Sequence, residues 1–207
     1  SSGDNDEAYL QANRAYVLAT PDEDETLPYH HVSRVRFGCR FSLQSVANNV
    51  NGIFIGLAGQ ALATGALTVN DAALVSTFHG IGLNILQADG NAINLVYQEN
   101  GSTLQTLLSG AIVPVADTWN TFEMDFNPLA RDTERITFWF DGTKSSTYAT
   151  AANVAAATFP KSTDSVSIPV GPTFLHIAGS DAIAKLRLGG WRCWSEPLKA
   201  RGTQVHG

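Results

Sequence analysis

The chain has 207 residues, of which 44% are hydrophobic and 15% charged, with 18 glycines and a formal net charge of −6. This is enough apolar material for one sizeable core, and low charge with abundant glycine is typical of short strands joined by turns. No apolar run approaches the ~18 residues of a membrane span. The two cysteines are too few for a disulfide framework or a cysteine-based metal cluster.

The negative charge is concentrated at the N-terminus. Seven of the 19 acidic residues lie in the first 25 positions, opposed by Arg14 alone, and the rest of the chain is formally neutral. A neutral body without a basic stripe argues against nucleic-acid binding. Residues 1–31 also contain two prolines and no strand alternation, so we expect an extended acidic arm. It is either a solvated leader or a segment that becomes ordered on a partner. The same segment lacks the basic and apolar regions of a signal peptide.

Strand and turn patterns begin at residue 32. In residues 32–46, Val35, Phe37, Cys39, Phe41 and Leu43 alternate with Arg34, Arg36, Gly38, Arg40 and Ser42, as in a half-buried strand. Similar patterns predict strands at residues 52–59, 80–87, 92–99, 103–108, 119–126, 135–140, 143–149, 173–178 and 184–194.

Turn residues separate these strands. Asp89-Gly90, Asn100-Gly101 and Asp141-Gly142 are hairpin signals, because both residue types adopt positive φ at low cost. Gly189-Gly190 predicts a bulge in the last strand, with Leu186 and Leu188 facing inward before it and Trp191 and Cys193 after it. Roughly ten short strands without helical periodicity predict an all-β sandwich over residues 32–196, followed by a tail over 197–207.

The segment TWNTFEMDFNP followed by RITFWFDGTKSSTYAT resembles the hairpin of concanavalin-like and laminin-G-like domains. The segments GIFIGLAG, INLVYQENGSTLQTL and KLRLGGWRCW resemble that family in order and spacing. The resemblance implies an antiparallel jelly-roll β-sandwich in which the first and last strands share a sheet. A compact version of the fold is similar to structural proteins of tailed bacteriophages, whereas other members are glucanases, lyases and lectins.

The resemblance also implies where the two cysteines lie. We expect Cys39 and Cys193 to point into the core as free thiols, since a protein assembled in the cytosol keeps its thiols reduced. Whether they are bridged is left open, because a bridge depends on the distance between the two Cα atoms.

No catalytic apparatus is expected. Related glucanases carry a Glu-x-Asp-x-x-Glu strand, whereas here Glu123 and Asp125 are followed by Asn127 and Pro128. Both carboxylates are expected on the solvent side of their strand, because Phe122, Met124 and Phe126 alternate with them. The histidines show no metal-ligand spacing, so no metal or cofactor is expected.

The leading interpretation is a non-enzymatic virion protein, a capsid cement or decoration protein assembled in the host cytoplasm. Its partners would be the major capsid protein or other virion subunits, it would form a homo-oligomer on the particle, and neither nucleic acid nor membrane would be bound. The arm would hold the partner through Tyr9, Leu10, Tyr16, Val17, Leu18, Asp22, Glu23, Asp24 and Glu25.

The alternative is a carbohydrate-binding, lectin-like module or a divergent polysaccharide-degrading one. Trp119 shares a strand face with Glu123 and Asp125, and an exposed indole beside polar groups can stack on a sugar ring. With Trp139 of the next strand, these residues form the candidate glycan face.

Overall fold

The computed structural model describes most of the predicted sandwich. The described residues are 7–14, 16, 18, 33–47, 50–59, 74–86, 92–98, 100–101, 103–130, 134–145, 169–178 and 185–197.

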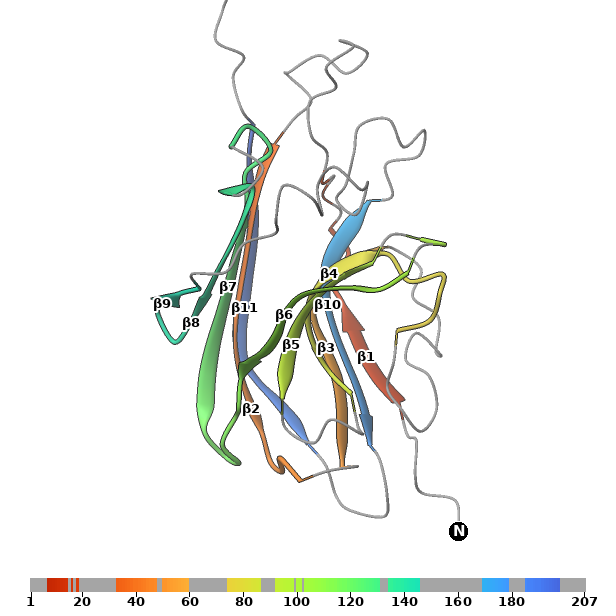
Figure 1. The fold of residues 1–207 in the computed structure, drawn as a ribbon, viewed down its shortest axis with the longest axis vertical. Helices are drawn as coiled ribbons and strands as arrows, with labels where there is room; N and C mark the ends of the chain where they lie inside the picture. The colour runs from red at the N-terminus through yellow and green to blue at the C-terminus, as the bar shows by residue number, and fades with distance from the viewer. Residues whose placement is uncertain are drawn as a thin grey trace, which may run out of the picture.

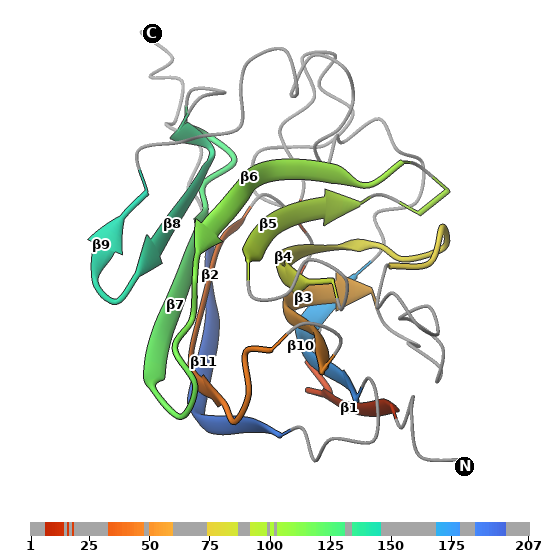
Figure 2. The same cartoon turned by 60° about the horizontal axis from the view of Figure 1, so that its bottom comes forward.

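Two antiparallel sheets lie face to face (Figures 1 and 2). The six-stranded sheet has the order β1 (Glu7–Gln11), β10 (Val170–Ala178), β3 (Asn51–Gly59), β4 (Gly80–Ile85), β5 (Ile93–Gln98) and β6 (Gln105–Ile112). The five-stranded sheet has the order β11 (Leu186–Pro197), β2 (Ser33–Leu43), β7 (Trp119–Phe126), β8 (Ile136–Phe140) and β9 (Thr143–Lys144). This arrangement confirms the predicted antiparallel sandwich.

The core lies between the inner faces of the two sheets. The alternating apolar residues of β2 and β7 point inward, and Phe37 and Phe122 meet edge to face with ring centres 6.0 Å apart. Phe174 of the opposite sheet lies 6.0 Å from Phe37, so aromatic packing joins the sheets directly. Successive side chains of a strand point to opposite faces, so every second residue of the five-stranded sheet lies on its outer surface.

The predicted Asp141-Gly142 turn and the predicted bulge are confirmed, and Asn100-Gly101 lies between the paired strands β5 and β6 with a positive φ at Gly101 alone. Asp141 and Gly142 have φ values of 45° and 76°, as a two-residue type I′ hairpin requires, and they join β8 to β9. The pairing of β11 with β2 shifts register between Leu188 and Gly190, which is the predicted bulge. The Asp89-Gly90 turn and most of the strand predicted at 143–149 lie outside the described residues.

The N-terminal segment differs from the predicted arm. Residues 7–11 form β1, which pairs with β10 along the edge of the six-stranded sheet. Tyr16 and Leu18 are buried in the main core, and the Tyr16 hydroxyl donates a 3.0 Å hydrogen bond to the Cys193 carbonyl of β11. The prediction of an arm without strands is therefore wrong for this part, because an edge strand pairs through its backbone and needs no regular alternation.

The structure describes only some of the other residues predicted to form the arm. Tyr9 and Leu10 lie on β1 and are about half exposed, whereas Val17 and the acidic run Asp22 to Glu25 lie outside the described residues. At the other terminus β11 extends to Pro197, one residue into the predicted tail. None of the residues that the structure describes forms a helix long and apolar enough to span a membrane.

The first and last strands of the predicted domain are neighbours, as the resemblance implied. Cys39 pairs in register with Trp191, and Cys193 pairs with Phe37, so both cysteines have the inward parity. Both are free thiols, Cys39 buried and Cys193 partly buried against the core.

Candidate functional site

The outer face of the five-stranded sheet gathers most of the polar and aromatic side chains considered as site residues. Because β11, β2, β7 and β8 are adjacent and in register, their outward residues form rows across the sheet. These residues are Arg34, Arg36, Gly38, Arg40, Trp119, Thr121, Glu123, Asp125, Thr137, Trp139, Arg192 and Trp194.

One row crosses four strands through a glycine. Arg192 of β11 is paired in register with Gly38 of β2. Gly38 is paired in turn with Glu123 of β7, and Glu123 with Trp139 of β8. Since Gly38 carries no side chain, Arg192 reaches over β2 and places Nη2 3.2 Å from Glu123 Oε1. A Cβ at position 38 would lie 3.4 Å from Glu123 Cγ and 3.5 Å from Arg192 Nε, so an alanine there would make only ordinary van der Waals contacts.

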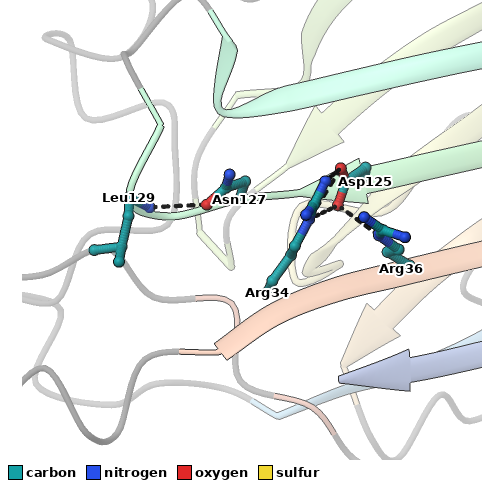
Figure 3. Close-up of polar contacts among 5 residues, drawn as sticks. All are labelled: Arg34, Arg36, Asp125, Asn127 and Leu129. Carbon is teal, nitrogen blue, oxygen red and sulfur yellow. Dashed lines mark hydrogen bonds and ion pairs between the residues drawn. The ribbon is translucent and has the colours of Figure 1, made fainter. Parts of the chain in front are cut away.

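A second row contains a carboxylate held by two arginines. Arg34 Nε donates to both oxygens of Asp125 at 2.8 and 3.1 Å, and Arg34 Nη2 donates to Oδ2 (Figure 3). Arg36 Nε lies on the other side, 3.4 Å from Asp125 Oδ1. The hydrogen bonds to Asp125 raise the pKa of Arg34 above its ordinary value, and Asp125 is only 7% exposed. The carboxylate therefore serves mainly to position the arginines.

Arginine and tryptophan side chains contact each other over the same face. Arg40 Cζ lies 4.8 Å from the centre of the Trp119 ring. Trp194 is approached by two guanidinium groups, with Arg36 Cζ at 5.8 Å and Arg192 Cζ at 5.3 Å from its centre. These distances are typical of cation–π contacts. Such contacts restrict the side-chain conformations of both partners on a surface open to solvent.

Two shallow depressions lie among these side chains. The first, of about 280 Å³, has Gly38 in its lining and is bordered by Arg40, Thr121 and Trp191; we call it the Arg40 depression. The second, of about 360 Å³, lies between Trp139 and Trp194 and includes the arginines around Asp125; we call it the Trp194 depression. Glu123 and Arg192 line both, so their ion pair separates the two depressions.

The structure brings together three of the four predicted glycan-face residues. Glu123, Asp125 and Trp139 line the Trp194 depression, while Trp119 stands farther along β7 beneath Arg40. One expectation is wrong, because Asp125 is buried under its arginines and is not a solvent-facing carboxylate.

The sequence prediction missed the contributions of β2 and β11. The alternation in residues 32–46 already placed Arg34, Arg36 and Arg40 on an outward face. It could not show that this strand lies between Trp194 and Glu123, since the order of strands depends on long-range pairing.

The two carboxylates are not arranged like a glycosidase pair. Each is held by an arginine, and Pro128 occupies the place of the third acid in the glucanase pattern. The neighbouring Asn127 is engaged locally, because its Oδ1 accepts the Leu129 N–H at 3.2 Å (Figure 3). Within the described ranges there is no group of three or more histidine, cysteine, aspartate or glutamate side chains that could hold a metal.

The outer face of the six-stranded sheet is used differently. Phe78 packs on Phe54 with ring centres 4.8 Å apart, within an apolar cluster that covers β3 and β10. Asn84 donates to the Ile53 carbonyl at 2.9 Å, and Gln98 donates to the Val75 carbonyl at 2.7 Å. These amides bond backbone carbonyls of β3 and of the segment that precedes β4, so the five-stranded sheet carries the stronger candidate site.

Comparison with solved structures places the chain in a known fold. The carbohydrate recognition domain of Emp46p superposes with a TM-score of 0.61 at 11% identity, covering 93% of this chain and 79% of that one. The corresponding domain of Emp47p gives 0.59 at 10% identity, with 93% and 80% covered.

A putative β-glucanase from Mycobacterium abscessus gives a TM-score of 0.51 at 14% identity, covering 90% of this chain and 68% of that one. At such identities the likeness establishes the concanavalin-like fold alone. The sequence matches no protein-family model and no curated protein.

Proposed function

We propose that this chain is a carbohydrate-binding module and that a glycan lies across the outer face of its five-stranded sheet. The observation that carries the proposal is the pair Trp139 and Trp194, which line one depression from strands β8 and β11. Three interstrand spacings separate these strands, about 14 Å, so a chain of sugar rings fits between the two indoles.

The chemistry of this face suits sugars. Indole rings offer flat apolar surface for the C–H faces of pyranose rings, and the arginines and Thr121 offer hydrogen-bond partners for hydroxyl groups. The carbohydrate recognition domains with the same fold support this class of ligand. They do not indicate which face binds it, since fold and site are separate properties.

Binding without catalysis remains part of this proposal. The side chains of Glu123 and Asp125 already accept hydrogen bonds from arginines, and this arrangement favours an electrostatic or positioning role. The rival polysaccharide-degrading activity is tested with the same protein, by following the appearance of new reducing ends or unsaturated sugars.

The capsid interpretation rests on the N-terminal segment and on the resemblance to structural proteins of tailed bacteriophages, and none of the structural neighbours named above supports it. The exposed Tyr9 and Leu10 on the edge strand β1 are the described residues that could contact a virion partner. Co-sedimentation with a particle, together with failure to bind any glycan, would restore that interpretation.

The proposal is tested by blocking the face without removing any of its side chains. Gly38→Leu should fill the junction of the two depressions, whereas Gly38→Ala should leave it open, because a Cβ there makes only ordinary contacts. Both variants and the wild type are screened on a glycan array, and hits are measured by calorimetry. We expect Gly38→Leu to lose binding and Gly38→Ala to retain it, with the same melting temperature within a few degrees.

Two results would overturn this assignment. A wild-type protein that binds no glycan on the array would exclude the function itself. Glycan binding that is equal in the wild type and Gly38→Leu would place the ligand elsewhere on the molecule.

A further inference from the structure

The two depressions carry a local charge opposite to that of the chain. Their lining contains four arginines and two carboxylates among the described residues, although the whole chain has a net charge of −6. The arginines are Arg34, Arg36, Arg40 and Arg192, and the carboxylates are Glu123 and Asp125.

The carboxylates do not neutralise all four arginines. Asp125 accepts its hydrogen bonds from Arg34, and Arg36 has only an ion-pair contact with it at 3.4 Å. Glu123 pairs with Arg192 at 3.2 Å, but both side chains are about half exposed, so solvent screens this pair. In the part of the chain that the structure describes, no carboxylate lies within ion-pair distance of Arg40. Glu196 of β11 is paired in register with Arg34 and also attracts it, so Arg36 shares Asp125 with Arg34 and Arg40 is left without a carboxylate partner among the described residues.

The tryptophans restrict the conformations of these arginine side chains and so orient their guanidinium groups toward a ligand. Arg40 is held over Trp119, and Arg36 and Arg192 lie on Trp194. A guanidinium packed on an indole uses its face for that contact, while its N–H groups remain available in its plane. This is the geometry that binds carboxylate or sulfate oxygens in pairs.

We propose that the glycan bound on this face is an anionic polysaccharide whose carboxylate or sulfate groups sit at Arg40 and at the Arg36–Arg192 pair. This inference rests on the proposed carbohydrate-binding function and names its ligand class. Arg36 and Arg40 are four residues apart on one strand, about 13 Å, so one sugar ring does not reach both. An oligosaccharide with repeated negative charges meets both positions, and a charged monosaccharide meets only one.

The test uses polymers that differ only in charge. Polygalacturonate is compared with its methyl ester, and dextran sulfate with dextran, by affinity electrophoresis and calorimetry on the full chain. The first pair reports on carboxylates and the second on sulfates, and preference for the charged member of either pair supports the inference. Binding of the charged member should weaken as salt rises from about 0.05 to 0.5 M.

A matched pair of variants separates a specific site from general attraction. Arg40→Met removes the charge and keeps an apolar stem on Trp119, whereas Arg187→Met removes a charge from the same sheet outside both depressions. Arg187 pairs with Asp117, and neither residue lines a depression. We expect Arg40→Met to weaken binding of the charged polymer about tenfold and Arg187→Met to change it less than about twofold.

Three outcomes would overturn the inference, and they differ in what else they overturn. Equal binding of the charged and neutral members of both pairs leaves a carbohydrate-binding protein without an anionic preference. An equal loss in Arg40→Met and Arg187→Met shows attraction by net charge without a site. No binding of any polymer, with the glycan array also negative, removes the proposed function together with the inference.

Discussion

Arg40 and Trp119 form a stacked pair beside the bulge of β11, with the guanidinium carbon 4.8 Å from the ring centre. Gly189 makes room for both, because a Cβ there would lie 2.9 Å from the edge of the Trp119 ring and 3.3 Å from Arg40 Cδ. The bulge glycine of the edge strand β11 thus shapes a contact between its neighbour β2 and the next strand β7. The pair has consequences for stability as well as for binding.

A double-mutant cycle should measure this contact directly. Arg40→Met, Trp119→Leu and the double variant are compared by urea denaturation, and we expect a coupling free energy of about 0.5–1 kcal/mol at this exposed site. The expected value is small because water screens the cation. A coupling near zero would show that the two side chains do not form a stable stack in solution.

Tyr16 connects the N-terminal segment to the far sheet, so its removal should destabilise the sandwich. Tyr16→Phe loses the hydrogen bond to the Cys193 carbonyl and should cost about 0.5–1.5 kcal/mol. Tyr16→Ala also removes a ring that is 9% exposed and should cost about 3–5 kcal/mol.

Both Tyr16 values are free energies of unfolding from denaturant titration, with Tyr9→Phe as the control on the exposed edge strand. If Tyr16→Ala were as stable as the wild type, the segment before residue 32 would be a detachable arm, as the sequence alone suggested.

His176 should make stability depend on pH. Burial lowers its pKa below the ordinary value of 6.5, and its Nε2 lies 2.9 Å from Asn51 Oδ1. Above that value the ring is neutral in both states and has no effect. As pH falls through 6.5, His176 binds a proton in the unfolded chain but stays neutral in the folded chain. The free energy of unfolding therefore decreases until the pH falls below the pKa of His176 in the folded chain.

The measurement compares wild type and His176→Gln by denaturant titration between about pH 8 and pH 5. The wild type should lose more stability over this range than the variant, which keeps an amide able to bond Asn51. Parallel curves would mean that the folded protein binds the proton as readily as the unfolded chain.

Both thiols should be unreactive in the folded protein. Burial raises the pKa of Cys39 to about 12 and that of Cys193 to about 11, so little reactive thiolate is present near neutral pH. Titration with a thiol reagent should detect almost no thiol in the native state and two per chain after denaturation without reductant. Detecting none after denaturation would mean that the two cysteines are bridged.

The strand pattern and turn chemistry were readable from the sequence because they are local. The alternation in residues 32–46 depends only on neighbours two positions apart, and it placed Phe37 in the core and Arg36 outside, as observed. Asp141-Gly142 and Gly189-Gly190 were likewise identified from two adjacent residues, whose backbone freedom defines a turn or a bulge.

The composition of the site was decided only by the tertiary structure. Trp194 and Glu123 are separated by 70 residues in the chain, yet both line one depression, because β11 and β7 flank β2. Burial of Asp125 likewise needed both arginines of the neighbouring strand. The strand β1 escaped prediction for a related reason: an edge strand is held by backbone hydrogen bonds to β10, and those partners lie far away in the sequence. Local periodicity determines which way a side chain points, and long-range pairing determines what it meets there.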